Sequence, residues 1–138
     1  MRGRALVGVG LLAAATAVYS CSPSRRHDGA QLYATHCASC HGTQGEGLRR
    51  LIPPLAKSDY LPANYAYLPC LIRKGQRQSI VVNGIEYNQY MPGNEGLTDS
   101  EITNLLNYVQ QHWGNQGDAY TMREVSGLLG ACNGSDGQ

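Results

Sequence analysis

Two cysteines and a histidine lie within one short run, Cys37-Ala38-Ser39-Cys40-His41. A pair of thiols separated by two residues and followed directly by a histidine is the pattern that attaches a c-type haem to a polypeptide. The spacing lets both thiols reach the two vinyl groups at one edge of the porphyrin, and the imidazole that follows can bind the iron. The run therefore predicts one covalently attached haem, with His41 as an axial ligand.

Two other chemistries use part of this pattern. A CxxC pair can be a redox dithiol of the thioredoxin type, which needs a preceding strand in a βαβ context. Residues 28–35 contain no β-branched alternation that would indicate such a strand. Cys37, Cys40 and His41 could also begin a zinc site, which would require a fourth ligand. The complete run favours haem attachment over both alternatives.

The N-terminal residues have the organisation of an export signal. Arg2 and Arg4 precede an uncharged apolar run, residues 5–18, that is too short to cross a bilayer as a helix. The run is followed closely by Ser20-Cys21, and a small residue before a cysteine at this place resembles a bacterial lipobox. The resemblance implies that Cys21 is acylated and becomes the first residue of the mature chain. The alternative is an ordinary signal peptide with an incidental cysteine.

These features predict a lipoprotein signal peptide over residues 1–20 and a polar tether over residues 21–27. We expect a protein anchored by lipid to a membrane of the bacterial cell envelope, on its periplasmic or extracytoplasmic side. Covalent haem and disulfides both suit such an oxidising compartment.

The charge balance restricts the partners. The chain has 11 Lys and Arg residues and 10 Asp and Glu residues, for a formal net charge of +1. Loss of residues 1–20 would remove two of the arginines. A chain so close to neutral argues against a nucleic-acid partner and against steering by one strongly basic face. Its length suits a single domain, and a buried haem would supply part of the apolar core.

Apolar periodicity predicts a chain built mostly of helices. Asp28 is placed to cap a first helix that reaches the cysteines, and Thr98 with Glu101 forms a capping box for the most regular helix. That helix would end at Gly114 and carry an apolar stripe made of Ile102, Leu105, Leu106, Val109 and Trp113. Weaker signals predict, in order, a helical turn at 58–61, a helix at 64–73 disturbed by Pro69, a hairpin of 79–82 and 85–87 around Asn83-Gly84, and a short helix from Thr121 to near Gly130.

Four further residues connect the haem run with a known family. Gly29 and Tyr33 precede the first haem cysteine by eight and four residues, and Leu105 and Tyr108 form a Leu-x-x-aromatic pair on the last regular helix. Together with the CxxCH run they resemble class I c-type cytochromes, specifically the small bacterial single-haem domains. The resemblance implies an all-α fold in which N- and C-terminal helices cross, with the glycine at their contact, around one covalent haem c. A small β-hairpin would precede the loop of the second iron ligand.

The resemblance also implies which residue is that second ligand. Residues 83–92 end in Met91-Pro92 and are similar to the family segment that supplies a methionine, so Met91 would bind the iron opposite His41. Pro53 matches the family proline whose carbonyl accepts a hydrogen bond from the second ring nitrogen of that histidine. The alternatives are an apolar filler at Met91 and a plain loop proline at Pro53. With phenylalanine absent, the aromatic lining would come from Tyr60, Tyr65, Tyr67, Tyr87, Tyr90 and Trp113.

Two features lie outside the family pattern. Cys70 and Cys132 could form a disulfide in an exported chain, or could remain two unpaired thiols. Residues 116–138 extend beyond the haem domain of residues 28–115. We expect this extension to pack on the domain and to end in a disordered tail.

The resemblance implies an electron carrier and not an enzyme. A His/Met-ligated haem would pass single electrons from a quinol-oxidising complex or a dehydrogenase to a terminal oxidase or reductase. Two alternatives remain open at this point. The chain could be a fixed haem subunit of a larger oxidase or dehydrogenase, or a haem-based sensor in which Met91 is absent from the iron or easily displaced.

Overall fold

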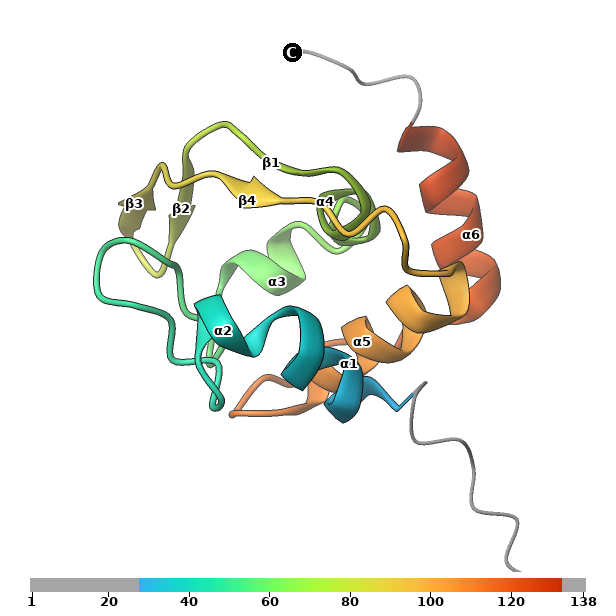
Figure 1. Cartoon of the computed structure of the whole chain (residues 1–138), viewed down its shortest axis with the longest axis horizontal. Coiled ribbons are helices and arrows are strands. Elements are labelled where there is room, and N and C mark those ends of the chain that lie inside the picture. The colour runs from blue at the N-terminus through green and yellow to red at the C-terminus, as the bar shows by residue number, and fades with distance from the viewer. Residues whose placement is uncertain (1–27, 133–138) are drawn as a thin grey trace, which may run out of the picture.

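The computed structural model describes residues 28–132. In this range the elements follow the order α1 (Gly29–His36), α2 (Ala38–His41), α3 (Tyr60–Ala63), α4 (Leu68–Lys74), β1 (Gly75–Gln76), β2 (Ile80–Val82), β3 (Ile85–Tyr87), β4 (Met91–Pro92), α5 (Asp99–Gln111) and α6 (Met122–Ala131). Figure 1 shows α6 at one side of the molecule and the β2–β3 pair at the other. The predicted signal peptide, the lipid on Cys21, the tether over 21–27 and the tail after Cys132 lie outside the described residues.

Side-chain caps define where the longer helices begin. Asp28 accepts a hydrogen bond from the backbone N–H of Ala30, over 3.1 Å, at the start of α1. Thr98 and Glu101 form the predicted capping box of α5, and Thr121 opens α6 with the same arrangement. Each cap satisfies backbone N–H groups that have no partner within the helix, so the three helices begin at the predicted residues.

Helices α1 and α5 pack against each other at Gly29. A Cβ atom on Gly29 would lie 2.6 Å from the Cβ of Tyr108 and would also overlap the carbonyl oxygen of Asn104. The two backbones can approach this closely only because Gly29 has no side chain. The rings of Tyr33 and Tyr108 have their centroids 5.8 Å apart, and Leu105 is buried in the same core.

The core joins α5 to its neighbours, and the end of α5 corrects one prediction. Of the predicted stripe, Ile102, Leu105, Leu106 and Val109 are buried. Trp113 does not continue it, because α5 ends at Gln111 and Trp113 has a left-handed backbone with φ of 53°. The side chain of Asn115 donates to the carbonyl of Val109 over 2.9 Å and to that of Leu55 over 2.8 Å. The carbonyl of Val109, in the last turn of α5, thus has a hydrogen-bond partner from beyond the helix, and α5 ends before Gly114.

The strands form two separate antiparallel pairs. β2 pairs with β3 around Asn83-Gly84, and both of these residues have positive φ, as tight hairpin turns require. β1 pairs with β4, with Gly75 opposite Pro92 and Gln76 opposite Met91. The sequence did not predict this second pair, because strands of two residues carry no periodicity. It joins the segment of Met91 to the end of α4.

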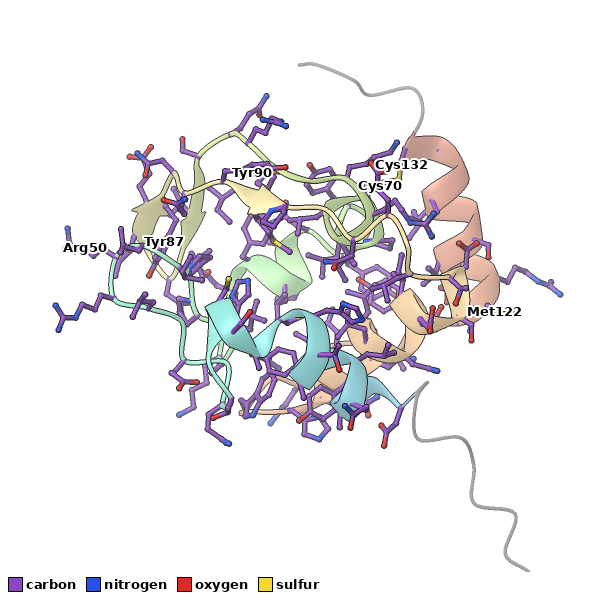
Figure 2. The ribbon with its side chains drawn as sticks, in the orientation of Figure 1. Arg50, Cys70, Tyr87, Tyr90, Met122 and Cys132 are labelled. Carbon is purple, nitrogen blue, oxygen red and sulfur yellow. A yellow bond between two sulfur atoms is a disulfide. The ribbon has the colours of Figure 1, made fainter. Side chains whose placement is uncertain are left out.

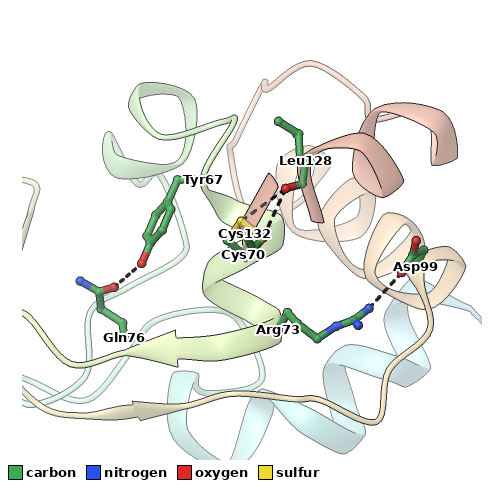
Figure 3. Close-up of a disulfide and its surroundings, with 7 residues drawn as sticks. All are labelled: Tyr67, Cys70, Arg73, Gln76, Asp99, Leu128 and Cys132. Carbon is green, nitrogen blue, oxygen red and sulfur yellow. Dashed lines mark hydrogen bonds and ion pairs between the residues drawn. A yellow bond between two sulfur atoms is a disulfide. The ribbon is translucent and has the colours of Figure 1, made fainter. Parts of the chain in front are cut away.

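Helix α4 begins later than predicted and is joined to α6. The helix expected from residue 64 begins at Leu68, because Pro69 occupies its first turn, where a missing N–H has no cost. Cys70 on α4 and Cys132 after α6 form a disulfide with a Cα–Cα distance of 5.7 Å (Figure 3). The bond closes a sequence separation of 62 residues. Restricting an unfolded loop of this length is worth about 4 kcal/mol of stability in the chain-entropy description.

None of the helices between residues 28 and 132 is both long enough and apolar enough to cross a membrane.

We expect Gly29→Ala to lower the free energy of unfolding by about 1–3 kcal/mol, because the added methyl group must push two helix backbones apart. Gly127→Ala is a matched control. Gly127 lies within α6, and a Cβ there would meet no other part of the described chain within 4 Å. Alanine at Gly127 should raise stability by about 0.5–1 kcal/mol. Chemical denaturation measures both variants, and a Gly29→Ala variant as stable as the unmodified protein would contradict the close contact.

Candidate functional site

A cleft with mostly apolar walls opens between α1–α2, α4 and the strands. Concave sites with mainly apolar walls and a few polar groups are typical of cofactor-binding sites. All five residues singled out in the sequence lie in the lining of this cleft, namely Cys37, Cys40, His41, Pro53 and Met91. An adjoining apolar hollow shares four of them and continues into the core against α5, and the cleft and the hollow together form one cavity.

The thiol-bearing run is shaped by a break between two helices. The backbone of Cys37 leaves helical geometry between α1 and α2, and α2 ends at His41, before Gly42 with φ of 80°. The hydroxyl of Tyr33 donates a hydrogen bond to the carbonyl of Gly42 over 2.6 Å. This bond ties α1 to the end of α2, so that both cysteines and His41 lie on one short turn at the cavity.

His41 is held in a defined protonation state. The side chain is 7% exposed, and its Nδ1 lies 3.0 Å from the carbonyl oxygen of Pro53. A carbonyl only accepts hydrogen bonds, so Nδ1 carries the proton and donates it. Burial lowers the pKa of His41 below its usual value, and the bond to Pro53 opposes this shift as the smaller cause. The ring is therefore neutral, and Nε2 keeps a lone pair for a metal ion.

The two thiols do not have the properties of a redox dithiol. Cys37 and Cys40 are not joined to each other or to another cysteine. Burial, and secondly the neighbouring Cys40, raise the pKa of Cys37 to about 11. Reactive dithiols of the thioredoxin type have a lowered thiol pKa, which this environment does not provide. The dithiol alternative is thus disfavoured by the surroundings of Cys37.

The zinc alternative also lacks support. Among residues 28–132, no group of three or more His, Cys, Asp or Glu side chains is placed to hold a metal ion. The fourth ligand that a structural zinc site requires is missing from this part of the chain.

Met91 reaches the cavity from the β1–β4 pair. It lies on β4, opposite Gln76 of β1, and lines both the cleft and the adjoining hollow together with His41. Met122, in contrast, is 59% exposed on α6, on the other side of the molecule from Tyr87 and Tyr90 (Figure 2). Of the two methionines in the described residues, only Met91 shares a cavity with His41.

The aromatic lining differs from the prediction. Tyr60, Tyr87 and Tyr90 line the cavity, as expected. The other three predicted residues do not. The ring of Tyr65 stacks on Tyr120, the hydroxyl of Tyr67 donates to Gln76, and Trp113 packs against Tyr33.

Several polar cavity residues were not predicted at all: Gln76, Gln78, Gln89 and Asn94. Gln89 falls within residues 83–92, the segment already singled out for Met91, whereas Gln76 and Gln78 lie on and after β1 and Asn94 follows β4, and no sequence pattern marks those three positions.

The arrangement fits a covalently attached haem. Two thiols lie beside a neutral imidazole on one turn, a thioether reaches the same cavity from a distant segment, and the remaining walls are mainly apolar. Neutral nitrogen and sulfur donors are the ligand types found on haem iron in electron-transfer proteins.

Comparison with known proteins agrees with this fit. The sequence profile of the family described as Cytochrome c matches residues 27–113. Cytochrome c-552 of Thermus thermophilus is 36% identical over 92 residues, covering 64% of this chain and 70% of that protein. A second cytochrome c-552 of the same species has the same identity and is covered over 62% of its length.

A more distant relative belongs to a larger protein. The cytochrome c subunit of the quinone alcohol dehydrogenase of Gluconobacter oxydans is 30% identical over 96 residues. The match covers 63% of this chain but only 18% of that subunit. Helix α6 lies beyond the region that the family profile matches.

Proposed function

Because the chain belongs to the cytochrome c family and carries covalently bound haem c, we propose that it is a membrane-anchored carrier of single electrons whose iron is bound by His41 and Met91. Proteins of this family are electron carriers and typically not enzymes.

One observation carries the ligand assignment: residues from three separate segments meet at one cavity. Cys37 and Cys40 would hold the haem through two thioether bonds, and His41 would offer Nε2 to the iron. The carbonyl of Pro53 orients the ring of His41 and raises its basicity through Nδ1. Met91 is the donor available from the strand side.

This ligand set favours a carrier over a catalyst. The haem, when bound, supplies an iron that exchanges one electron. A neutral thioether and a neutral imidazole favour the reduced iron relative to two nitrogen ligands and raise the potential. With His41 and Met91 both bound to it, the iron would have no position left for a substrate. The mainly apolar walls carry few dipoles that would have to reorient, so the surroundings would need little rearrangement when the charge changes.

The membrane anchor rests on the N-terminal residues alone. A small residue precedes Cys21 after the apolar run of residues 5–18, which supports cleavage and acylation at that cysteine. We place the protein on the periplasmic or extracytoplasmic side of the envelope, where its donor would be a quinol-oxidising complex or a dehydrogenase and its acceptor a terminal oxidase or reductase.

A second candidate is a fixed haem subunit of a larger enzyme. It is favoured by the relatives named as cytochrome c subunits of a quinone alcohol dehydrogenase and by the additional helix α6. Extraction of native membranes in mild detergent separates the two candidates. A carrier should be recovered as a free monohaem protein, whereas a fixed subunit should co-purify with a large catalytic subunit.

Met91→Ala should abolish the weak far-red absorption band that methionine gives to ferric haem, and should lower the reduction potential. The covalent haem itself should remain, because Cys37, Cys40 and His41 are untouched. Met122→Ala is the matched control, since Met122 is exposed on α6 and should leave the band unchanged. Optical spectra of both oxidation states provide the measurement. An unmodified protein that lacks the band, or that binds carbon monoxide tightly when reduced, would contradict Met91 ligation and favour the sensor.

Cys21→Ser should transfer the protein from the membrane fraction to the soluble fraction of the envelope. The reason is that stable anchoring requires more than one acyl chain, which a lipidated Cys21 would supply. Fractionation followed by haem staining measures the distribution. An unmodified protein that is already soluble would contradict the lipid anchor without affecting the haem assignment.

A further inference from the structure

Helix α6 is covalently joined to α4 although it lies outside the region matched by the family profile. The disulfide connects Cys70, in the middle of α4, to Cys132 at the end of α6. The sulfur atoms lie 3.6 Å and 3.3 Å from the carbonyl oxygen of Leu128 (Figure 3). Val125 of α6 is completely buried, so the helix also contributes to the core.

A second connection holds the C-terminal end of α4. Arg73, in its last turn, forms an ion pair with Asp99 at the start of α5 over 3.0 Å (Figure 3). The second carboxylate oxygen of Asp99 accepts a hydrogen bond from the hydroxyl of Ser126 on α6 over 2.8 Å. A partly exposed ion pair contributes little to stability alone. Here the carboxylate of Asp99 also binds Ser126, so the ion pair connects α4 to the same helix, α6, that the disulfide holds. Helix α4 is thus held to α5 and α6 at two places.

The C-terminal end of α4 also contacts the segment that carries Met91. The backbone N–H of Asn94 donates to the carbonyl of Ile72 over 2.8 Å. A Cβ on Gly93 would lie 2.5 Å from the carbonyl oxygen of Arg73, so that the two backbones are in direct contact. α4 then continues into β1, where Gln76 pairs with Met91.

The strand of Met91 has little support apart from α4. β4 contains only Met91 and Pro92, and its partner β1 is equally short. Isolated two-stranded pairs of this kind are marginal in water. The position of the thioether therefore depends on the position of α4.

We infer that α6 and its disulfide are a positioning device for the sixth iron ligand: by holding α4, they hold Met91 at the iron. This inference rests on the proposed ligation by Met91. Without the brace, α4 and the β1–β4 pair shift more often, and the fraction of molecules with a displaced thioether rises. An external ligand that competes with Met91 would then bind with higher apparent affinity, because its affinity scales with the fraction of competent molecules.

The test is a titration of the ferric, haem-loaded protein with imidazole, followed by loss of the far-red band. The variant Cys70→Ser/Cys132→Ser removes the brace and leaves no free thiol from it. We expect imidazole to bind this variant about tenfold more tightly than the unmodified protein. Gly93→Ala, which forces β4 away from α4, should give an increase in the same direction.

Leu32→Ala is the control for general loss of stability. Leu32 is buried in α1 and does not line the cavity, and truncation of such a residue leaves a destabilising void. Its imidazole affinity should stay within about twofold of the unmodified protein. An equal increase in Leu32→Ala and in the disulfide variant would overturn the inference, and so would an unchanged affinity in the disulfide variant.

The absorption band of the unmodified protein separates failure of the ligand assignment from failure of the brace. Absence of the band in the unmodified protein would refute Met91 ligation itself, and the inference with it, whereas a normal band with unchanged affinities refutes only the brace. If the double variant does not accumulate, reduction and alkylation of Cys70 and Cys132 in the haem-loaded protein, followed by reoxidation of the iron, replaces it, because this treatment opens the same disulfide. A raised imidazole affinity after the treatment supports the brace, and an unchanged one overturns it.

Discussion

Attachment of both thiols and one imidazole on a single turn is the constraint on which the rest of the structure depends. Residues 37–41 can define only one edge and one face of the haem, because they are contiguous. In the proposed ligation, the opposite face takes its ligand from elsewhere in the chain, and the fold brings Met91 of β4 to the same cavity as His41. The protein can thus be divided into a part that orients His41 and a part that delivers Met91.

The first part is secured by local bonds and one helix contact. Tyr33 binds the carbonyl of Gly42, and Pro53 binds the ring of His41, so the turn and its histidine are held from two sides. Close approach of α1 and α5 at Gly29 then places this unit on the core. The second part has no equivalent local support, since β1 and β4 are only two residues each. It is held indirectly, by α4.

The same division explains what could be predicted from the sequence. The residues of the haem run and the caps at Asp28 and Thr98 are local patterns, and local chemistry determines what they do. The end of α5 was misjudged because the side chain of Asn115 satisfies it from beyond the helix. The pairing of β1 with β4, and with it the polar lining around Gln76, depends on tertiary contacts and has no sequence period. The Cys70–Cys132 bond was left open for the same reason, because only the fold brings α4 and α6 together.

The two proposed iron ligands should therefore differ in how far they depend on the whole fold. His41 directly follows the second attachment point, so a partial opening of the structure leaves it near the iron. Met91 is separated from the attachment site by α3, α4 and the β2–β3 hairpin, and any loosening of α4 increases its freedom. Local unfolding free energies in one protein range from near zero to the global value, and segments with few buried apolar contacts lie at the low end. A covalent connection placed at α4, and not at the haem run, stabilises the part of the site that the chain otherwise holds least firmly.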